Sequence, residues 1–157
     1  LTEVKLNSKI PTIEDNAFYG CSSLTNLSLP SSVTSIKNSA FYGCSSLAEI
    51  KITSSLISIG DSSFAGCSSL TQITIPSSVT SIGQYAFYGC SSLTQILIPS
   101  SVTSIGKHAF NECPLLTSIP EISTSISIVD ISDSRKSTSI KISGLNVGSW
   151  KEGILDT

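Results

Sequence analysis

The amino-acid sequence predicts a β-rich solenoid, which is a stack of short, equivalent coils of chain. Two observations support this prediction: a unit of 23 residues repeats through most of the chain, and apolar residues recur at fixed positions inside it. A unit this short cannot bury an apolar face by itself, so the units must stack and share one core.

The repeats begin at leucines spaced 23 residues apart, and we number the positions within a repeat from 1 to 23. The five opening residues are Leu1, Leu24, Leu47, Leu70 and Leu93. Position 13 is Ile in all five repeats, position 18 holds every Phe of the chain, and position 21 holds every Cys. Residues 1–115 are therefore predicted to form five repeats of one solenoid.

The order of residues inside a repeat predicts two strands and a helical turn. Positions 4 and 6 alternate with polar neighbours, which is the period of a strand. Positions 10 and 13 predict a second, short extended stretch. Asp15, Asn38 and Asp61 at position 15 are typical helix N-caps. The segment after them, such as residues 86–90, is predicted to form one helical turn that ends at a left-handed glycine.

The consensus L-x-x-I-x-I-P-x-x-V-x-x-I-G-x-x-A-F-x-x-C-x-x resembles the BspA-like leucine-rich repeat of surface and secreted proteins of bacteria and some protists. The resemblance covers Leu1 to Leu115. It implies a leucine-rich-repeat solenoid, curved and right-handed, with a parallel sheet on the concave side and short helical turns. It also implies a cell-surface or secreted location and a role in adhesion or binding rather than catalysis.

Residues 116–157 are predicted to be degenerate repeats or a C-terminal cap of the same solenoid. In one register, Leu116 keeps the 23-residue spacing and Ile119 falls at position 4. In the other, the segment resembles a shorter leucine-rich repeat. The inward strand residues would then be Ile126, Val129 and Ile131. In both registers Ile140 and Ile142 supply a later strand, and Trp150 could cover the last repeat as a lid.

Composition excludes several functions. The chain has 157 residues, 13% of them charged, and a formal net charge of −2. Without an excess of Lys and Arg, a nucleic-acid partner is not expected. No apolar run reaches the ~18 residues of a membrane span, so no membrane insertion is expected of this segment. It opens with neither a signal peptide nor an initiator Met, as expected for a piece of a longer protein.

Few residues offer chemistry for catalysis or metal binding. His108, the only histidine, occupies the variable position 16, and we interpret it as a surface substitution because a catalytic base needs a positioned partner. No nucleophile, phosphate-loop or zinc motif is present. We therefore expect no enzyme activity, no cofactor and no metal.

The five cysteines allow three interpretations. Their spacing of 23 residues lacks the close pairs of metal sites. Disulfides are an alternative, since stacked Cα atoms lie ~4.8 Å apart. Parallel side chains and an odd count suit bridges poorly, so we favour a ladder of buried thiols, in which Cys44, Cys67 and Cys90 are buried and reduced.

Three sets of side chains remain to be placed. The Phe column is predicted to be a buried spine. Tyr19, Tyr42 and Tyr88 at position 19 are predicted to face outward on the convex side, either as partly exposed packing or as an adhesive strip. Positions 3 and 5 point away from the core and form the predicted binding face. Its residues are Asn26, Glu49, Lys51, Gln72, Thr74 and Gln95.

The binding face has Glu and Lys at one end and neutral amides at the other. Such a face can hydrogen-bond an extended partner without strong electrostatic steering. These observations favour a non-enzymatic binding module whose partner is a protein or glycan of a host or neighbouring cell. The alternatives are a structural spacer within a larger surface protein and an intracellular protein-interaction scaffold.

Overall fold

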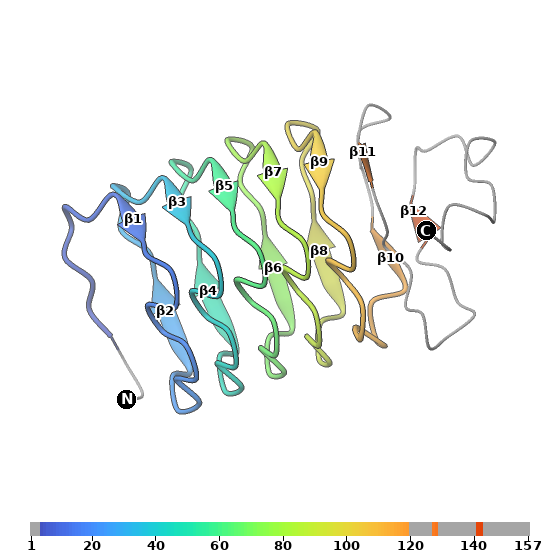
Figure 1. Ribbon diagram of the computed structural model, residues 1–157, viewed down its shortest axis with the longest axis horizontal. Helices are drawn as coiled ribbons and strands as arrows, with labels where there is room; N and C mark the ends of the chain where they lie inside the picture. The colour runs from blue at the N-terminus through green and yellow to red at the C-terminus, as the bar shows by residue number, and fades with distance from the viewer. Residues whose placement is uncertain (1–3, 120–126, 129–140, 143–157) are drawn as a thin grey trace.

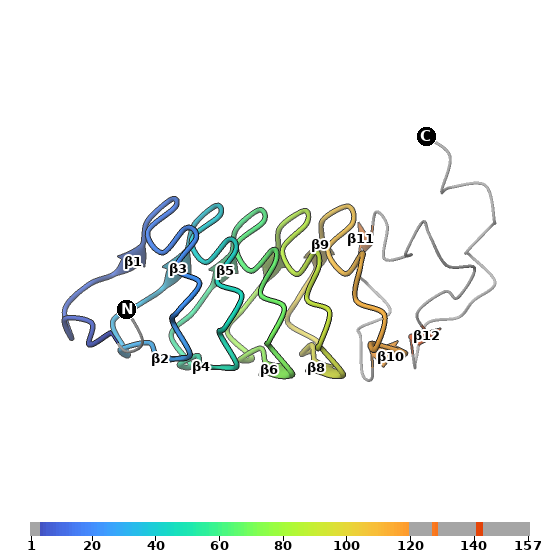
Figure 2. The ribbon, with the colours of Figure 1, turned by 90° about the horizontal axis from the view of Figure 1, so that it is seen from below.

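The structure, a computed structural model, describes residues 4–119, 127–128 and 141–142. Over these residues the chain winds as a parallel β-solenoid in which each 23-residue repeat makes one coil, called a rung. The rungs stand side by side along the long axis (Figure 1). Figure 2 separates two rows of strands, with the odd-numbered strands in one row and the even-numbered strands in the other.

The even-numbered row begins with three-residue strands whose middle side chain is buried and whose outer two are exposed. They are Asn26–Ser28 (β2), Glu49–Lys51 (β4), Gln72–Thr74 (β6) and Gln95–Leu97 (β8). Ser118–Ile119 (β10) and Lys141–Ile142 (β12) continue the row. Parallel pairing joins β2 to β4, β6 to β8 and β10 to β12. Ile73 pairs with Ile96, which confirms the predicted column at position 4.

The odd-numbered row forms the largest sheet, in which all strands are parallel. Its strands, in sheet order, are Thr12–Ile13 (β1), Ser35–Ile36 (β3), Ser58–Ile59 (β5), Ser81–Ile82 (β7), Ser104–Ile105 (β9) and Ser127–Ile128 (β11). The parallel sheet is confirmed, but its continuous part runs along position 13 rather than positions 4 to 6. In the described residues no pairing joins β4 to β6. Ile50 and Ile73 on either side are 7% and 3% exposed, so the interruption affects hydrogen bonds and not the apolar column.

The described strands after residue 115 keep the 23-residue spacing. Ile128 pairs with Ile105, and Ile142, one repeat further on, pairs with Ile119. These strands follow the first of the two predicted registers. Other predicted residues lie outside the described part of the chain, namely Leu1, Ile126, Val129, Ile131, Ile140 and Trp150.

A column of stacked phenylalanine rings forms the centre of the core. Neighbouring ring centroids lie 5.2, 5.2, 5.4 and 5.6 Å apart along the stack. Four of the rings are fully buried, and Phe18 in rung 1 is partly buried. The predicted spine is confirmed, and each ring fills the space that its neighbours leave.

The segment from position 15 to position 20 forms tight turns instead of the predicted helical turn. In rung 2, Tyr42 N and Cys44 N donate to carbonyl oxygens three residues back, each at 3.1 Å. Phe41 N and Gly43 N instead donate across to rung 3, each at 2.8 Å. Positive φ angles of 54° at Ser39 and 70° at Gly43 produce this alternation. A helix would keep all these bonds within the segment, and the stack would lose its bonds on this side.

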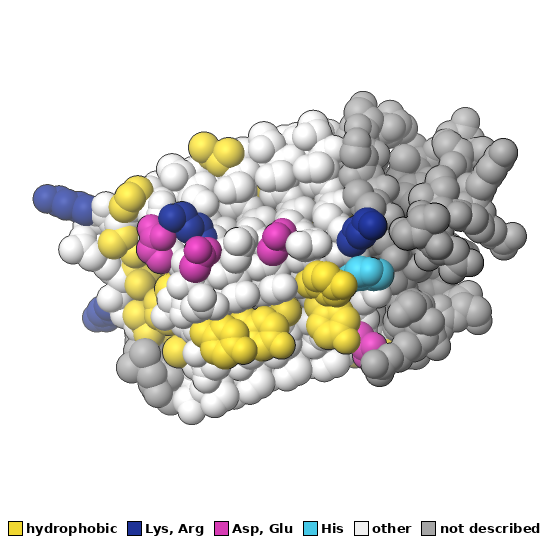
Figure 3. All heavy atoms as spheres, in the orientation of Figure 1, with side chains coloured by type: hydrophobic (Ala, Val, Ile, Leu, Met, Phe, Trp, Pro, Cys, Tyr) yellow, Lys and Arg dark blue, Asp and Glu magenta, His cyan; other side chains and the backbone are white. Residues whose placement is uncertain are grey.

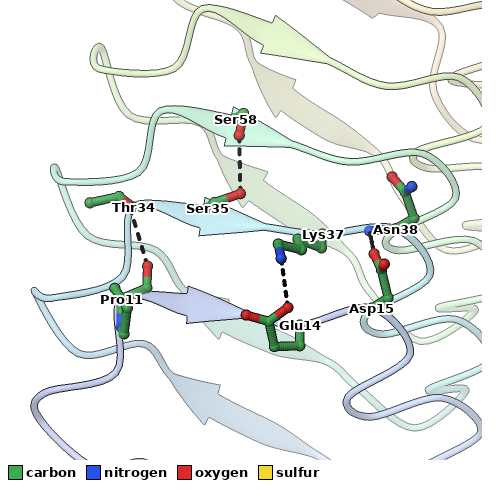
Figure 4. Close-up of polar contacts among 8 residues, drawn as sticks. All are labelled: Pro11, Glu14, Asp15, Thr34, Ser35, Lys37, Asn38 and Ser58. Carbon is green, nitrogen blue, oxygen red and sulfur yellow. Dashed lines mark hydrogen bonds and ion pairs between the residues drawn. The ribbon is translucent and has the colours of Figure 1, made fainter.

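The side chains at position 15 cap the neighbouring rung, so the predicted helix N-cap role is wrong. Asp15 Oδ1 accepts a hydrogen bond from Asn38 N at 2.9 Å (Figure 4). The same bond recurs at 2.9 Å from Asp61 N to Asn38 and from Gln84 N to Asp61. Each side chain therefore satisfies a backbone donor of the next rung.

Glycine at position 14 permits close approach of neighbouring rungs. A Cβ at Gly83 would lie 2.5 Å from Asp61 N, and one at Gly106 would lie 2.2 Å from Gln84 N. Such separations are far inside van der Waals contact, so the predicted bend at this position is also a packing requirement. Lys37 occupies the same position in rung 2, next to the end of the described stack.

Serine and threonine hydroxyls add bonds between rungs. Ser32 Oγ donates to Ile10 O at 2.6 Å, and Ser101 Oγ donates to Val79 O at 2.7 Å. Thr34 Oγ1 donates in the same way to Pro11 O at 3.2 Å (Figure 4). The 35 serines of the chain therefore contribute to stacking as well as to solvation.

Candidate interaction surfaces

The predicted binding residues lie on the outward side of β2, β4, β6 and β8, which we call the strand face. All six side chains are exposed, namely those of Asn26, Glu49, Lys51, Gln72, Thr74 and Gln95. Strand register places Asn26 beside Glu49 and Gln72 beside Gln95. The fold thus brings the set together in two groups, one on β2 and β4 and the other on β6 and β8. Glu3, at the equivalent position of rung 1, lies outside the described residues.

The two groups on the strand face differ in charge. Glu49 and Lys51 lie on β4, whereas β6 and β8 carry no charged residue. Glu49 and Lys51 form no ion pair with the described part of the chain. The side chains of Gln72, Thr74 and Gln95 form no hydrogen bond there either. Their donors and acceptors face solvent and are available to a partner.

The strand face is hollowed at its N-terminal end. The depression is shallow and open, and it reaches from the residues before β2 to β4. Its lining residues are Val4, Lys5, Leu6, Thr25, Asn26, Leu27, Ser28, Glu49 and Lys51. Three of the predicted binding residues therefore share one concavity with two further polar side chains of β2 and its approach.

Leu97 is an exposed apolar residue on the strand face, and the predicted binding set omits it. Its side chain is 43% exposed, and it pairs with Thr74 on the neighbouring strand. Its place at position 5 was a usable signal, because a side chain there points away from the core. Leu97 gives the uncharged end of the strand face an apolar contact point beside Gln95.

The turn side of the stack, formed by positions 14 to 20, carries exposed aromatic rings. Tyr19 and Tyr42 stack with centroids 4.9 Å apart, and Tyr85 stacks on His108 at 5.1 Å. Tyr88 meets Tyr85 edge to face at 5.8 Å. Figure 3 shows hydrophobic side chains in two groups along this side, with the histidine next to the second. We call these five residues the tyrosine band.

Exposure within the tyrosine band follows the prediction in part. Tyr19 and Tyr42 are 56% and 40% exposed, which confirms that they face outward. Tyr88 is partly buried, because Tyr85 of the same rung packs against it. Tyr85 is itself 39% exposed and was not foreseen, since position 16 showed no aromatic pattern. Its signal was a large ring at a position that holds Asn or Ser in the first three rungs.

His108, which the sequence predicts to be a surface substitution, contacts two neighbouring residues. Its ring is half-buried against Tyr85, and its Nδ1 lies 2.9 Å from Nδ2 of Asn111. Both His108 and Tyr85 have positive φ angles, 57° and 55°. This conformation is uncommon for a bulky residue such as Tyr85, whereas histidine adopts it more readily.

Charged side chains lie beside the tyrosine band. Lys37 Nζ binds Glu14 Oε2 at 2.6 Å (Figure 4). This hydrogen bond, together with the Glu14 charge, raises the pKa of Lys37. The pair is exposed and contributes little to stability. Asp15 and Asp61 use their carboxylates for backbone bonds between rungs, and neither forms an ion pair with the described residues.

The cysteines form a ladder of free thiols. Cys44 Sγ lies 3.1 Å from Phe18 O, and Cys67 and Cys90 each make the equivalent contact at 3.2 Å. The predicted burial of Cys44, Cys67 and Cys90 is confirmed. Burial raises the pKa of Cys44 to about 11 and also raises that of Cys67. The pKa of Cys90 is raised by its hydrogen bond with Cys113 and by burial. These thiols are therefore weak nucleophiles at neutral pH.

The described residues contain no cluster of three or more His, Cys, Asp or Glu side chains that could hold a metal ion. No helix within this part of the chain is long and apolar enough to cross a bilayer.

The parallel rungs, with their buried Ile, Phe and Cys columns, define a leucine-rich-repeat solenoid. Residues 1–117 match the family model of the BspA-type leucine-rich repeat region in six copies. The match spans most of the chain, so the chain belongs to this family. No curated protein sequence matches the chain.

Crystal structures of bacterial leucine-rich repeat proteins share the fold. The T. pallidum leucine-rich repeat protein is 42% identical with a TM-score of 0.70, over 71% of this chain and 52% of that one. A leucine-rich cell surface protein of Faecalibacterium prausnitzii is 36% identical with a TM-score of 0.66, over 84% and 32%. A Bacteroides ovatus leucine-rich repeat protein is 29% identical with a TM-score of 0.54, over 77% and 40%. The chain thus spans about half or less of the length of these relatives.

Proposed function

We propose that this segment is a non-enzymatic binding module of a cell-surface or secreted protein, and that its strand face contacts an extended protein or glycan chain of a host or neighbouring cell. The family relationship supports a binding role. The similarity to a leucine-rich cell surface protein of F. prausnitzii supports the location.

The observation that carries the proposal is the set of exposed polar side chains on β2, β4, β6 and β8, which stand in register within the pair β2–β4 and within the pair β6–β8. Within each pair equivalent side chains stand one strand spacing apart, about 4.8 Å, so neighbouring units of an extended chain can meet neighbouring strands. Gln72, Thr74 and Gln95 have free hydrogen-bonding groups, and Leu97 adds an apolar contact. The hollow at β2 and β4 gives the charged end a shallow recess.

The strand face sets an expectation for salt dependence. Its charged end holds Lys5, Glu49 and Lys51, whereas its other end is neutral. A partner that binds mainly through hydrogen bonds loses little affinity when ionic strength rises, unlike one that binds a polybasic site.

The test is a binding screen of the 157-residue chain on glycan and peptide arrays, followed by two double variants. Gln72→Lys with Gln95→Lys places like charges side by side on the strand face and leaves the core untouched. Ser77→Lys with Ser100→Lys adds the same charges to exposed turns of the same two rungs. Loss of binding in the first variant alone supports the proposal. Equal loss in both, or loss in the second alone, places the contact elsewhere.

A structural spacer is the second candidate, and the bonding between rungs favours it. Backbone bonds, position-15 side chains and Ser or Thr hydroxyls all join one rung to the next, which suits an extended and stiff rod. Exchange of the segment for another repeat array of equal length in the parent protein separates the two functions. If the parent protein keeps its full function after the exchange, and the segment binds no ligand on the arrays, the segment acts as a spacer.

A further inference from the structure

We propose that the tyrosine band is a second interaction surface, separate from the strand face, and that it binds a polypeptide segment rich in Lys or Arg side chains. This inference goes beyond the proposed function because it uses a different side of the stack and a different partner chemistry. The band comprises Tyr19, Tyr42, Tyr85, Tyr88 and His108.

The repeats themselves show that the fold does not require these rings. Position 19 is Ala65 in rung 3, yet Gly66 N still donates to Tyr88 O at 2.7 Å and Cys67 N to Phe64 O at 3.1 Å. Rung 2, with a tyrosine at this position, makes the equivalent bonds at 2.8 and 3.1 Å. The solenoid can therefore form without the exposed tyrosines, which add contact surface to it.

Position 16 gives a second, independent argument. All five described rungs adopt positive φ there, and rungs 1 to 3 carry the small polar residues Asn16, Ser39 and Ser62. Rung 4 instead carries Tyr85, a large ring at a backbone conformation that is uncommon for it, and rung 5 carries His108, a residue type that tolerates positive φ better. The bonds between rungs fix this backbone, so the large ring of Tyr85 is an addition that the turn does not require, and unfavourable backbone conformations of this kind cluster at functional positions.

The charge beside the band identifies the kind of partner. Asp61 O accepts a hydrogen bond from Ser39 N, and Ser39 O accepts one from Tyr42 N, so Asp61 lies next to the turn that carries Tyr42. Asp15 directly precedes Asn16, whose carbonyl accepts from Tyr19 N at 3.0 Å, so Asp15 lies at the start of the turn that carries Tyr19. Figure 3 shows acidic side chains, with one basic side chain among them, on the surface near the first aromatic group.

These two carboxylates form no ion pair within the described residues. The ion pair found there joins Lys37 to Glu14, so Asp15 and Asp61 remain as unpaired carboxylates on the turn side of rungs 1 and 3. An ammonium or guanidinium group of a partner is attracted both by these carboxylates and by the aromatic rings of the band. Both contacts favour a cation, and Arg stacks on aromatic rings especially well.

The band suits a polypeptide because it is long and shallow. Aromatic rings occur on four of five successive rungs, which cover about 20 Å at the spacing of stacked strands. A basic polypeptide can place several side chains along such a length, and tyrosines contribute strongly to protein contacts because they are rigid and amphipathic.

The experiment measures binding of three fluorescent 12-residue peptides to the 157-residue chain at low ionic strength by anisotropy. The peptides alternate Ser with Arg, with Gln or with Glu. We expect the Arg peptide alone to bind, with affinity that falls as salt is added.

Each substitution in the test copies a residue that another rung already carries at the same position. Tyr42→Ala copies Ala65, Tyr85→Ser copies Ser62, and Asp61→Asn copies Asn38, whose Oδ1 accepts the same backbone bond. We expect each to weaken binding of the Arg peptide about twofold to fivefold, as loss of one exposed cation contact predicts. Ser100→Lys changes the net charge by the same amount as Asp61→Asn, on an exposed turn outside both surfaces, and serves as the control.

Three outcomes overturn the proposal. The first is equal binding of all three peptides, and the second is an effect of Ser100→Lys as large as that of Asp61→Asn. The third is unchanged binding in the chain that combines Tyr42→Ala with Tyr85→Ser. Thermal unfolding of every variant shows whether the fold is intact.

Discussion

The buried columns and the exposed turn side of the same rungs obey different rules. Position 18 is Phe in five rungs and position 13 is Ile, whereas position 16 is Asn, Ser, Ser, Tyr and His in order. The backbone is nonetheless the same at position 16, with φ from 53° at Ser62 to 58° at Asn16. Packing therefore determines the columns, and the bonds between rungs determine the turns whatever side chain they carry.

The largest difference is expected for a ring in the middle of the Phe column. Phe64→Ala leaves a cavity that rungs on both sides hold open, and we expect a loss of about 3–5 kcal/mol of unfolding free energy. Phe18→Ala, at the partly exposed end of the column, is expected to cost less. Chemical denaturation followed by far-UV circular dichroism measures both, and equal, small losses would contradict a buried spine.

A methyl group at a rung contact tests how tightly the turns are held. Gly83→Ala places a Cβ 2.5 Å from Asp61 N, and we expect a loss of about 1–3 kcal/mol, as for overpacked sites. Lys37→Ala at the same position of rung 2 removes only an exposed ion pair and should cost below ~1 kcal/mol. If the two variants unfold at the same denaturant concentration, rung spacing is more adjustable than the structure indicates.

Alkaline pH should lower the stability of the fold through the buried cysteine thiols. Burial raises the pKa of Cys44 to about 11 from the ordinary value of 9.0. Above pH 9 the unfolded chain releases protons that the folded chain still holds, so stability falls as pH rises from 9 to 11. The denaturation midpoint should therefore drop over this range. A chain with Cys44, Cys67 and Cys90 changed to Ala should show a smaller drop, and an unchanged drop would assign the effect to Tyr and Lys instead.

The buried hydroxyl of Ser63 should slightly lower the unfolding free energy. Ser63 occupies position 17, where the other rungs carry Ala, and its buried Oγ has no hydrogen-bond partner. Ser63→Ala should raise the unfolding free energy by about 1 kcal/mol, because an unpaired buried hydroxyl is removed. Ala86→Ser is the matched reverse change and should lower it. A loss of stability in the first variant would mean that the hydroxyl has a partner.

Much of the fold was predictable because the repeat exposes its own rules. Five aligned units identify the columns at positions 4, 13, 18 and 21 without any structure. The turn at positions 15 to 20 was not predictable in the same way. Residues such as Asp15 and Gly20 are typical of helix ends, and only the bonds between rungs, which depend on stacking distance, select tight turns over a helix.

The two candidate surfaces also differ in how far the sequence predicts them. The six predicted strand-face residues are exposed because strand alternation is a local rule. Tyr85 and His108 escaped prediction because their contact depends on positive φ at position 16 and on the neighbouring rung, neither of which has a signature in sequence.

The most direct test of this difference is the unfolding free energy of one chain with four surface substitutions, compared with Phe64→Ala. The four changes are Tyr42→Ala, Tyr85→Ser, Gln95→Asn and Leu97→Thr, and each copies a residue found at the same position of another rung. If the columns supply the stability, the unfolding free energy stays within about 1 kcal/mol of the unaltered chain, as exposed positions predict. A loss as large as that of Phe64→Ala would contradict the account.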